Sequence, residues 1–231
     1  MEENEFQRRA ALADATRRLI RAVRLTQVDP DALEATTELV TQAAQGLEAD
    51  LFAGPHSQLA FEPVLGINPS VPVEQFFPFS SVVGPLNPIS APLRMEVVDL
   101  AELDIEGPAV SATGTAIRAR VTLPEQYVGP PFDQAHGGII AHLFDELLGV
   151  ATIMGAGGGF TGRLTIHYRK PTPALKPLEL KAWVESVSGR KLVARGEIRH
   201  EGVVTAEADG LFIQPAGREP GQAPNLTEPV G

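Results

Sequence analysis

The chain has 231 residues, of which 43% are hydrophobic and 21% charged, and its formal net charge is −10. This composition is typical of a globular protein with one sizeable core, and the negative charge argues against nucleic acid as a partner. The chain contains no cysteine, which excludes disulfides, thiolate catalysis and zinc–thiolate sites. Its acidic start lacks the apolar segment of a signal peptide, and we see no apolar run of transmembrane length. We therefore expect a cytoplasmic protein without a membrane span.

Two helices are expected at the N-terminus. Apolar residues recur at helical spacing over residues 5–27, among six arginines. Asp29 followed by Pro30 predicts the N-cap and first turn of a second helix, which ends near residue 51. We assign residues 1–53 to a helical extension that packs on its own domain or on a dimer mate. A basic amphipathic helix also suits a membrane surface or a partner helix.

Residues 54–92 change in composition, because eight of the 20 prolines lie between Pro55 and Pro92. So many prolines argue against helices and central strands, whereas four interspersed phenylalanines argue against free disorder. We expect an extended, proline-rich arm that wraps over the core. A Pro- and Gly-rich tail, residues 215–231, is expected to be loose.

The remaining segment, residues 93–214, predicts a single α+β domain. Hydrophobic patterning predicts strands over 93–100 and 110–121, a helix over 138–154, and four strands over 161–168, 178–188, 191–200 and 203–213. The helix is apolar on most sides and is therefore expected to be buried. Two strands, a buried helix and four antiparallel strands predict a sheet wrapped around a helix.

The stretch that is most informative about chemistry is A-H-G-G-I-I-A-H-L-F-D-E, residues 135–146. Glycines at the start of a helix expose N–H groups at the positive end of the helix dipole, where an oxyanion or a carbonyl oxygen can bind. Asp145 lies on the same helix among apolar neighbours, so we expect it to be buried and functional. Glu146 is the alternative carboxylate and points about 100° away around the helix.

Three features together carry a family resemblance: the segment G-P-P-F-D-Q-A-H-G-G (129–138), Asp145 with Thr161, and the strand L-T-I-H-Y-R-K-P-T-P (164–173). They resemble the hotdog-fold thioesterases of the PaaI-like family, and in particular the human mitochondrial long-chain acyl-CoA thioesterases and their actinobacterial relatives. The resemblance covers roughly residues 93–214. It implies an antiparallel sheet wrapped around a central helix, and a homodimer with two active sites shared between subunits. Dimer and tetramer both stay open.

The resemblance also implies roles for individual residues in hydrolysis of an acyl-CoA thioester. Asp145 would be the general base or nucleophile, and the N–H of Gly137 or Gly138 would form the oxyanion hole. His136 would help orient the substrate carbonyl or the loop, and Thr161 from the other subunit would bind or orient the attacking water. Coenzyme A, as part of the substrate, would lie near the strand end formed by Tyr168, Arg169, Lys170 and Pro171. No separate cofactor is implied.

Alternatives remain open at this point. An enoyl-CoA hydratase of the same fold would use Asp133 with His136, and a non-catalytic protein would bind acyl-CoA without turnover. His142 lies one turn before Asp145, so a His–Asp dyad is conceivable, although packing is the simpler interpretation. Nine of the 19 basic residues fall between Arg163 and Arg199 and could receive an anionic ligand. The histidines show no metal-ligand spacing, so we expect no metal.

Overall fold

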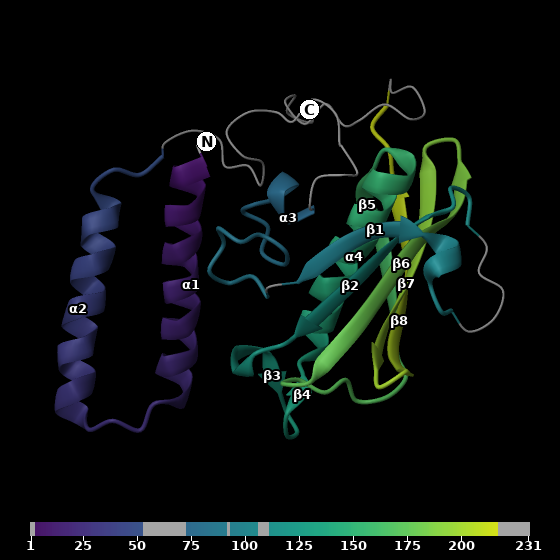
Figure 1. Ribbon diagram of the computed structural model, residues 1–231. Coiled ribbons are helices and arrows are strands. Elements are labelled where there is room, and N and C mark those ends of the chain that lie inside the picture. The colour runs from purple at the N-terminus through teal and green to yellow at the C-terminus, as the bar shows by residue number, and fades with distance from the viewer. Residues whose placement is uncertain (1–2, 53–72, 92, 106–110, 217–231) are drawn as a thin grey trace.

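The computed structural model describes residues 3–52, 73–91, 93–105 and 111–216. Two N-terminal helices, α1 (Glu3–Leu25) and α2 (Pro30–Glu48), stand beside the main domain, and α1 lies between α2 and that domain (Figure 1). The predicted start of α2 is confirmed, because the Asp29 side chain accepts a hydrogen bond from the Ala32 N–H at 2.9 Å. Both helices thus begin and end within a few residues of their predicted positions.

Polar contacts hold α1 on the domain. The Arg21 guanidinium contacts the Glu125 carboxylate at 2.8 Å, and this hydrogen bond lowers the pKa of Glu125 to about 2. One turn earlier, Arg17 donates to three backbone carbonyls between Gly84 and Asn87 and to the Ser90 hydroxyl. The face of α1 that carries these arginines is therefore fixed against the domain.

The proline-rich segment is only partly as expected. Residues 53–72 lie outside the described part of the chain. Residues 73–91 are not extended: they begin with a one-turn helix, α3 (Val73–Phe76), and continue as turns. The Leu86 N–H donates to the Pro78 carbonyl at 2.8 Å, which folds this segment back on itself. Buried apolar side chains, among them Val82 and Val83, then anchor it in the core. Proline prevents an internal helix or ladder, but it does not prevent compact turns.

The main domain is built on a six-stranded antiparallel sheet with the order β1-β2-β6-β7-β8-β5. The strands are β1 (Arg94–Asp99), β2 (Thr115–Thr122), β5 (Phe160–Tyr168), β6 (Pro177–Ser188), β7 (Lys191–His200) and β8 (Val203–Ile213). A 3-10 turn, η1 (Leu100–Glu102), follows β1. The last three predicted strands are confirmed and are joined as hairpins, with Gly189 between β6 and β7 and Glu201-Gly202 between β7 and β8, all at positive φ.

Helix α4 (Gly137–Ala156) lies in the curve of this sheet (Figure 1). Leu148 of α4 packs closely on the strands because two facing residues are glycines. A Cβ at Gly196 would lie 3.0 Å from Leu148 Cδ2, and a Cβ at Gly210 would lie 3.1 Å from Leu148 Cδ1. The helix ends at Gly157, which caps it in the left-handed conformation with φ of 78°. The α+β prediction of a sheet wrapped around a central helix is confirmed.

Within the described residues, α4 is also the one helix with the length and apolar composition of a membrane span. The expectation that no apolar run reaches this length was therefore wrong. Eight of its residues are buried, and they pack against the sheet of the same chain. A helix enclosed in a core meets the same criterion, so this feature is weak evidence for a membrane span.

A short irregular region connects β2 to α4. It contains the 3-10 turn η2 (Glu125–Tyr127) and a two-stranded ribbon of β3 (Val128–Gly129) and β4 (Gln134–Ala135). The Ala135 N–H donates to the Thr172 carbonyl at 2.8 Å, which ties the ribbon to the segment after β5. The ribbon therefore delivers His136 to the start of α4 in a defined position.

Candidate active site

The first turn of α4 offers one free backbone donor. His136 is the N-cap, and its Nδ1 accepts a hydrogen bond from the Gly138 N–H at 3.0 Å. Its carbonyl oxygen accepts from the Ile139 and Ile140 N–H groups at 2.9 and 3.2 Å. In the described part of the chain, the Gly137 N–H has no acceptor. Gly137 rather than Gly138 is thus the amide available to an external oxygen atom at the positive end of the helix.

The same contact determines which nitrogen of the His136 ring carries the proton. An Nδ1 that accepts a hydrogen bond carries no proton, so a neutral ring carries its proton on Nε2. His136 is exposed, which leaves the Nε2–H able to donate to a ligand. The Nε2–H and the neighbouring Gly137 N–H form a pair of donors that suits a carbonyl oxygen.

Tyr168, at the end of β5, supports this position. Its hydroxyl donates to the Gly137 carbonyl at 2.9 Å. The sequence predicts Tyr168 as a coenzyme A contact, whereas in the structure its polar end holds the peptide of Gly137. A Cβ added at Gly137 would lie 3.5 Å from the Tyr168 hydroxyl, which is an ordinary contact, so the site tolerates a small side chain there.

Asp145 and Thr161 form the second polar group. The Thr161 Oγ1–H donates to Asp145 Oδ1 at 2.9 Å. We expected Thr161 to come from the other subunit, but the structure places it beside Asp145 of its own chain. The reason is local, because β5 begins directly after the turn at Gly157 that ends α4. Asp145 is also exposed in the single chain, so the expectation that it is buried was wrong.

The partly buried carboxylate on this helix is Glu146. It accepts a hydrogen bond from the hydroxyl of Ser80, whose side chain is fully buried. Burial raises the pKa of Glu146, and the Ser80 hydrogen bond and the charge of His142 oppose that rise only in part. His142 does not pair with Asp145 but contacts the Ser81 hydroxyl through Nε2 at 2.7 Å. Both serines lie in the folded 73–91 segment, which therefore covers one flank of α4.

The predicted coenzyme A contacts differ in availability. Arg169 is engaged, since its Nε lies 2.6 Å from a carboxylate oxygen of Glu207. Lys170 and Pro171 are exposed, and the Lys170 ammonium forms no hydrogen bond or ion pair with a described residue. Lys170 is thus the cation at this strand end that can approach an anionic ligand. No hydrogen bond joins Asp133 to His136 in the described residues, so the pairing that a hydratase needs has no support.

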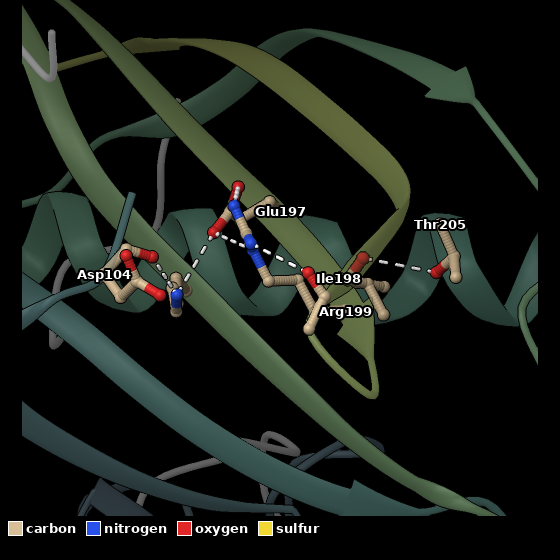
Figure 2. A network of polar contacts seen from close by, with 7 residues as sticks. Asp104, Glu197, Ile198, Arg199 and Thr205 are labelled. Carbon is tan, nitrogen blue, oxygen red and sulfur yellow. Dashed lines mark hydrogen bonds and ion pairs between the residues drawn. The ribbon is translucent and has the colours of Figure 1, made fainter. Parts of the chain in front are cut away.

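The basic zone between Arg163 and Arg199 is partly a structural cluster. Figure 2 shows Glu197 beside Arg199 in a buried network. The Arg199 Nε donates to Glu197 at 2.8 Å, and the Lys181 Nζ lies 3.4 Å from the same carboxylate and donates to the Asp104 carbonyl. All three charged residues are at most 6% exposed. They satisfy one another and are not free for an anionic ligand.

The two polar groups on α4 are too far apart to act on one substrate atom within one chain. Gly137 and Asp145 are eight residues apart, or about 12 Å along the helix axis at 1.5 Å per residue. Two cavities on the described chain lie elsewhere. One of about 540 Å³, lined by Arg94, Arg118 and neighbouring residues, lies on β1, β2 and β6, at the opposite end of the sheet from β5. No described group of three or more His, Asp or Glu side chains could hold a metal ion.

Comparison with known proteins identifies the class. The family model of the thioesterase superfamily matches residues 132–207. The chain is similar to a thioesterase superfamily protein of known crystal structure, with 30% sequence identity and a TM-score of 0.70. The match covers 89% of this chain and 90% of that one. The fold is therefore the hotdog α+β fold. The chain belongs to the thioesterase superfamily.

Two curated relatives are similar over a shorter region. Acyl-coenzyme A thioesterase THEM4 of Xenopus laevis is 32% identical over 93 residues, which are 39% of this chain and 42% of that protein. The protein of the same name from Mus musculus is 35% identical over 81 residues, which are 34% of this chain and 35% of that protein. This chain thus matches less than half the length of either relative.

Proposed function

We propose that the chain is an acyl-CoA thioesterase whose active site is completed by a second copy of the chain. Asp145 and Thr161 come from one copy, and His136 and Gly137 come from the other. One observation carries this proposal. Thr161 already orients Asp145 in the middle of α4, whereas the free Gly137 N–H lies at the start of the same helix. The names of the curated relatives support acyl-CoA as the substrate.

The outer edge of β5 is where the second copy would meet the first. β5 is the last strand of the sheet and pairs only with β8 among the described strands. An unpaired edge can extend a sheet into a second copy by two-fold symmetry. In that arrangement the two α4 helices run antiparallel, which brings the start of one beside the middle of the other. The 12 Å separation within one chain is then bridged between chains.

The chemistry follows from these groups. The thioester carbonyl oxygen accepts hydrogen bonds from the Gly137 N–H and the His136 Nε2–H. The Asp145 carboxylate removes a proton from water as the water oxygen bonds to the carbonyl carbon, and the two donors stabilise the oxyanion that forms. The carbon–sulfur bond then breaks, the carboxylic acid is released, and the thiolate takes the proton from Asp145. Direct attack by Asp145, followed by hydrolysis of the anhydride, uses the same residues.

Release of free thiol from a panel of acetyl-, hexanoyl-, palmitoyl- and phenylacetyl-CoA tests this proposal. We expect hydrolysis by the wild type and a loss of about 10²–10⁴ in kcat for Asp145→Asn, the range for loss of a general acid or base. Asp133→Asn is the matched control and is expected to retain activity. Full turnover by Asp145→Asn would contradict the assignment. Binding of acyl-CoA without any thiol release would favour a non-catalytic binding protein instead.

A further inference from the structure

Helix α2 buries none of its residues within the described chain, although it presents a stripe of four apolar residues and one threonine. The stripe repeats with alternating spacings of four and three residues, which is the seam pattern of a helix that packs on another helix. Its members are Leu33, Thr37, Val40, Ala44 and Leu47. The three large side chains, Leu33, Val40 and Leu47, are 46%, 39% and 55% exposed.

Helix α1 carries a matching stripe on its outer face. Arg17, which faces the domain, defines the inner face of α1. Leu12, Ala15, Leu19 and Val23 fall on the opposite side by helical periodicity. Leu12 is 48% exposed, Val23 is 67% exposed and Leu19 is half-buried, so α2 of the same chain leaves most of this stripe uncovered. The four-residue connection between the helices permits antiparallel packing, yet both stripes remain open.

The two helices are also complementary in charge. α1 contains six arginines, of which Arg17 and Arg21 contact the domain, and three acidic residues, whereas α2 contains four acidic residues and no basic residue. Three of the four acidic residues of α2, Glu34, Glu38 and Glu48, fall on one flank of its stripe by helical periodicity. Opposite charges beside an apolar seam favour pairing between these helices and fix its orientation.

We propose that α2 of one copy packs its stripe on the outer face of α1 of a second copy, and that the exchange is reciprocal. This pairing covers the exposed stripes of both helices at once and joins an acidic helix to a basic one. Reciprocal exchange is a closed, two-fold symmetric contact, as expected for copies of one chain. It is separate from the β5 edge and does not depend on the catalytic assignment. Helix α1 remains fixed on its own domain through Arg17 and Arg21.

Cysteine cross-linking tests this directly, because the chain has no cysteine of its own. One chain carries Ala15→Cys on α1 and a second chain carries Val40→Cys on α2. After mixing, unfolding, co-refolding and mild oxidation, we expect up to about half of the chains to run as a disulfide-linked dimer on a non-reducing gel, because half of the dimers are mixed and only mixed dimers bring the two cysteines together. Gln42→Cys, on the opposite face of α2, is the matched control and is expected to give at least fivefold less dimer.

The double variant Ala15→Cys/Val40→Cys in one chain distinguishes the alternatives. The proposal predicts linked dimers and a small fraction of internally linked monomer. A product that is mainly internally linked monomer would show that the hairpin closes on itself and would overturn the proposal. Equal dimer yield for Val40→Cys and Gln42→Cys would also overturn it, since random collision does not distinguish the faces of α2. Thiol release is expected to be unchanged in Val40→Cys, because α2 contributes no residue to the proposed site.

Discussion

Replacement of Gly137 by proline removes one hydrogen-bond donor from the candidate site and little else. Gly137 is the first residue of α4, a position that proline favours because its N–H has no partner within the helix. His136 has φ of −62° and ψ of 135°, which is the conformation that a residue before proline adopts. The new Cβ would lie 3.5 Å from the Tyr168 hydroxyl, an ordinary contact. The fold should therefore accept Gly137→Pro.

The expected effect is on the rate. Loss of one oxyanion donor costs about 10²–10³ in kcat, or about 2.7–4 kcal/mol of transition-state stabilisation. Gly137→Ala adds a comparable Cβ but keeps the N–H, so it is the matched control and should lose less than about fivefold. Thiol release from acyl-CoA gives kcat for both variants, and thermal unfolding checks that both fold. Similar kcat values for the proline and alanine variants would refute the role of the Gly137 N–H.

Three further predictions follow from the contacts around α4. Thr161→Val should lower kcat by about 10- to 150-fold, because a hydrogen bond to a charged group contributes about 1.5–3 kcal/mol. An unchanged kcat would remove Thr161 from the site. Lys170→Ala should raise KM for acyl-CoA about fivefold, which corresponds to the free energy of one exposed ion pair. The KM for a pantetheine thioester, which lacks the nucleotide, should not change. Arg169→Ala should have a smaller effect because Arg169 is already paired. Glu146→Gln should be more stable than the wild type at pH 8. The raised pKa of Glu146 means that the wild-type fold favours the protonated carboxyl, and the stability this gives is lost as pH rises through that pKa. The difference in stability should vanish below pH 4.5, the ordinary pKa of Glu, and a difference in thermal unfolding that is constant with pH would contradict the prediction.

Much of the fold could be predicted because its signals are local. Asp29-Pro30 starts α2, Gly157 ends α4 and Glu201-Gly202 forms a hairpin turn, each for a reason that lies within a few residues of sequence. The 73–91 segment shows the limit of such reasoning. Its prolines exclude long helices, but the compact turns depend on hydrogen bonds and on apolar contacts with the core, which patterning does not reveal.

The candidate site shows the same division. The position of Asp145 on α4 follows from the sequence, but its exposure does not. Burial on the outer side of a helix depends on what packs there, and here Ser80, 66 residues away from Glu146, covers Glu146 and leaves Asp145 open. The choice between Gly137 and Gly138 likewise depends on the ring of His136, whose Nδ1 occupies one amide. His142 and Glu146 are four residues apart and therefore lie on one face of α4. That spacing is the sequence signal for the face of α4 that contacts Ser80 and Ser81.

The most direct test of a site shared between two copies is complementation between two inactive variants. Asp145→Asn keeps an intact donor pair, and Gly137→Pro keeps an intact carboxylate. When equal amounts are unfolded together, refolded and assayed for thiol release, half of the dimers should be mixed and each should contain one complete site, which restores about a quarter of wild-type activity. If mixed dimers form and activity stays at the level of the separate variants, the two groups do not act across the interface and the proposed site is wrong.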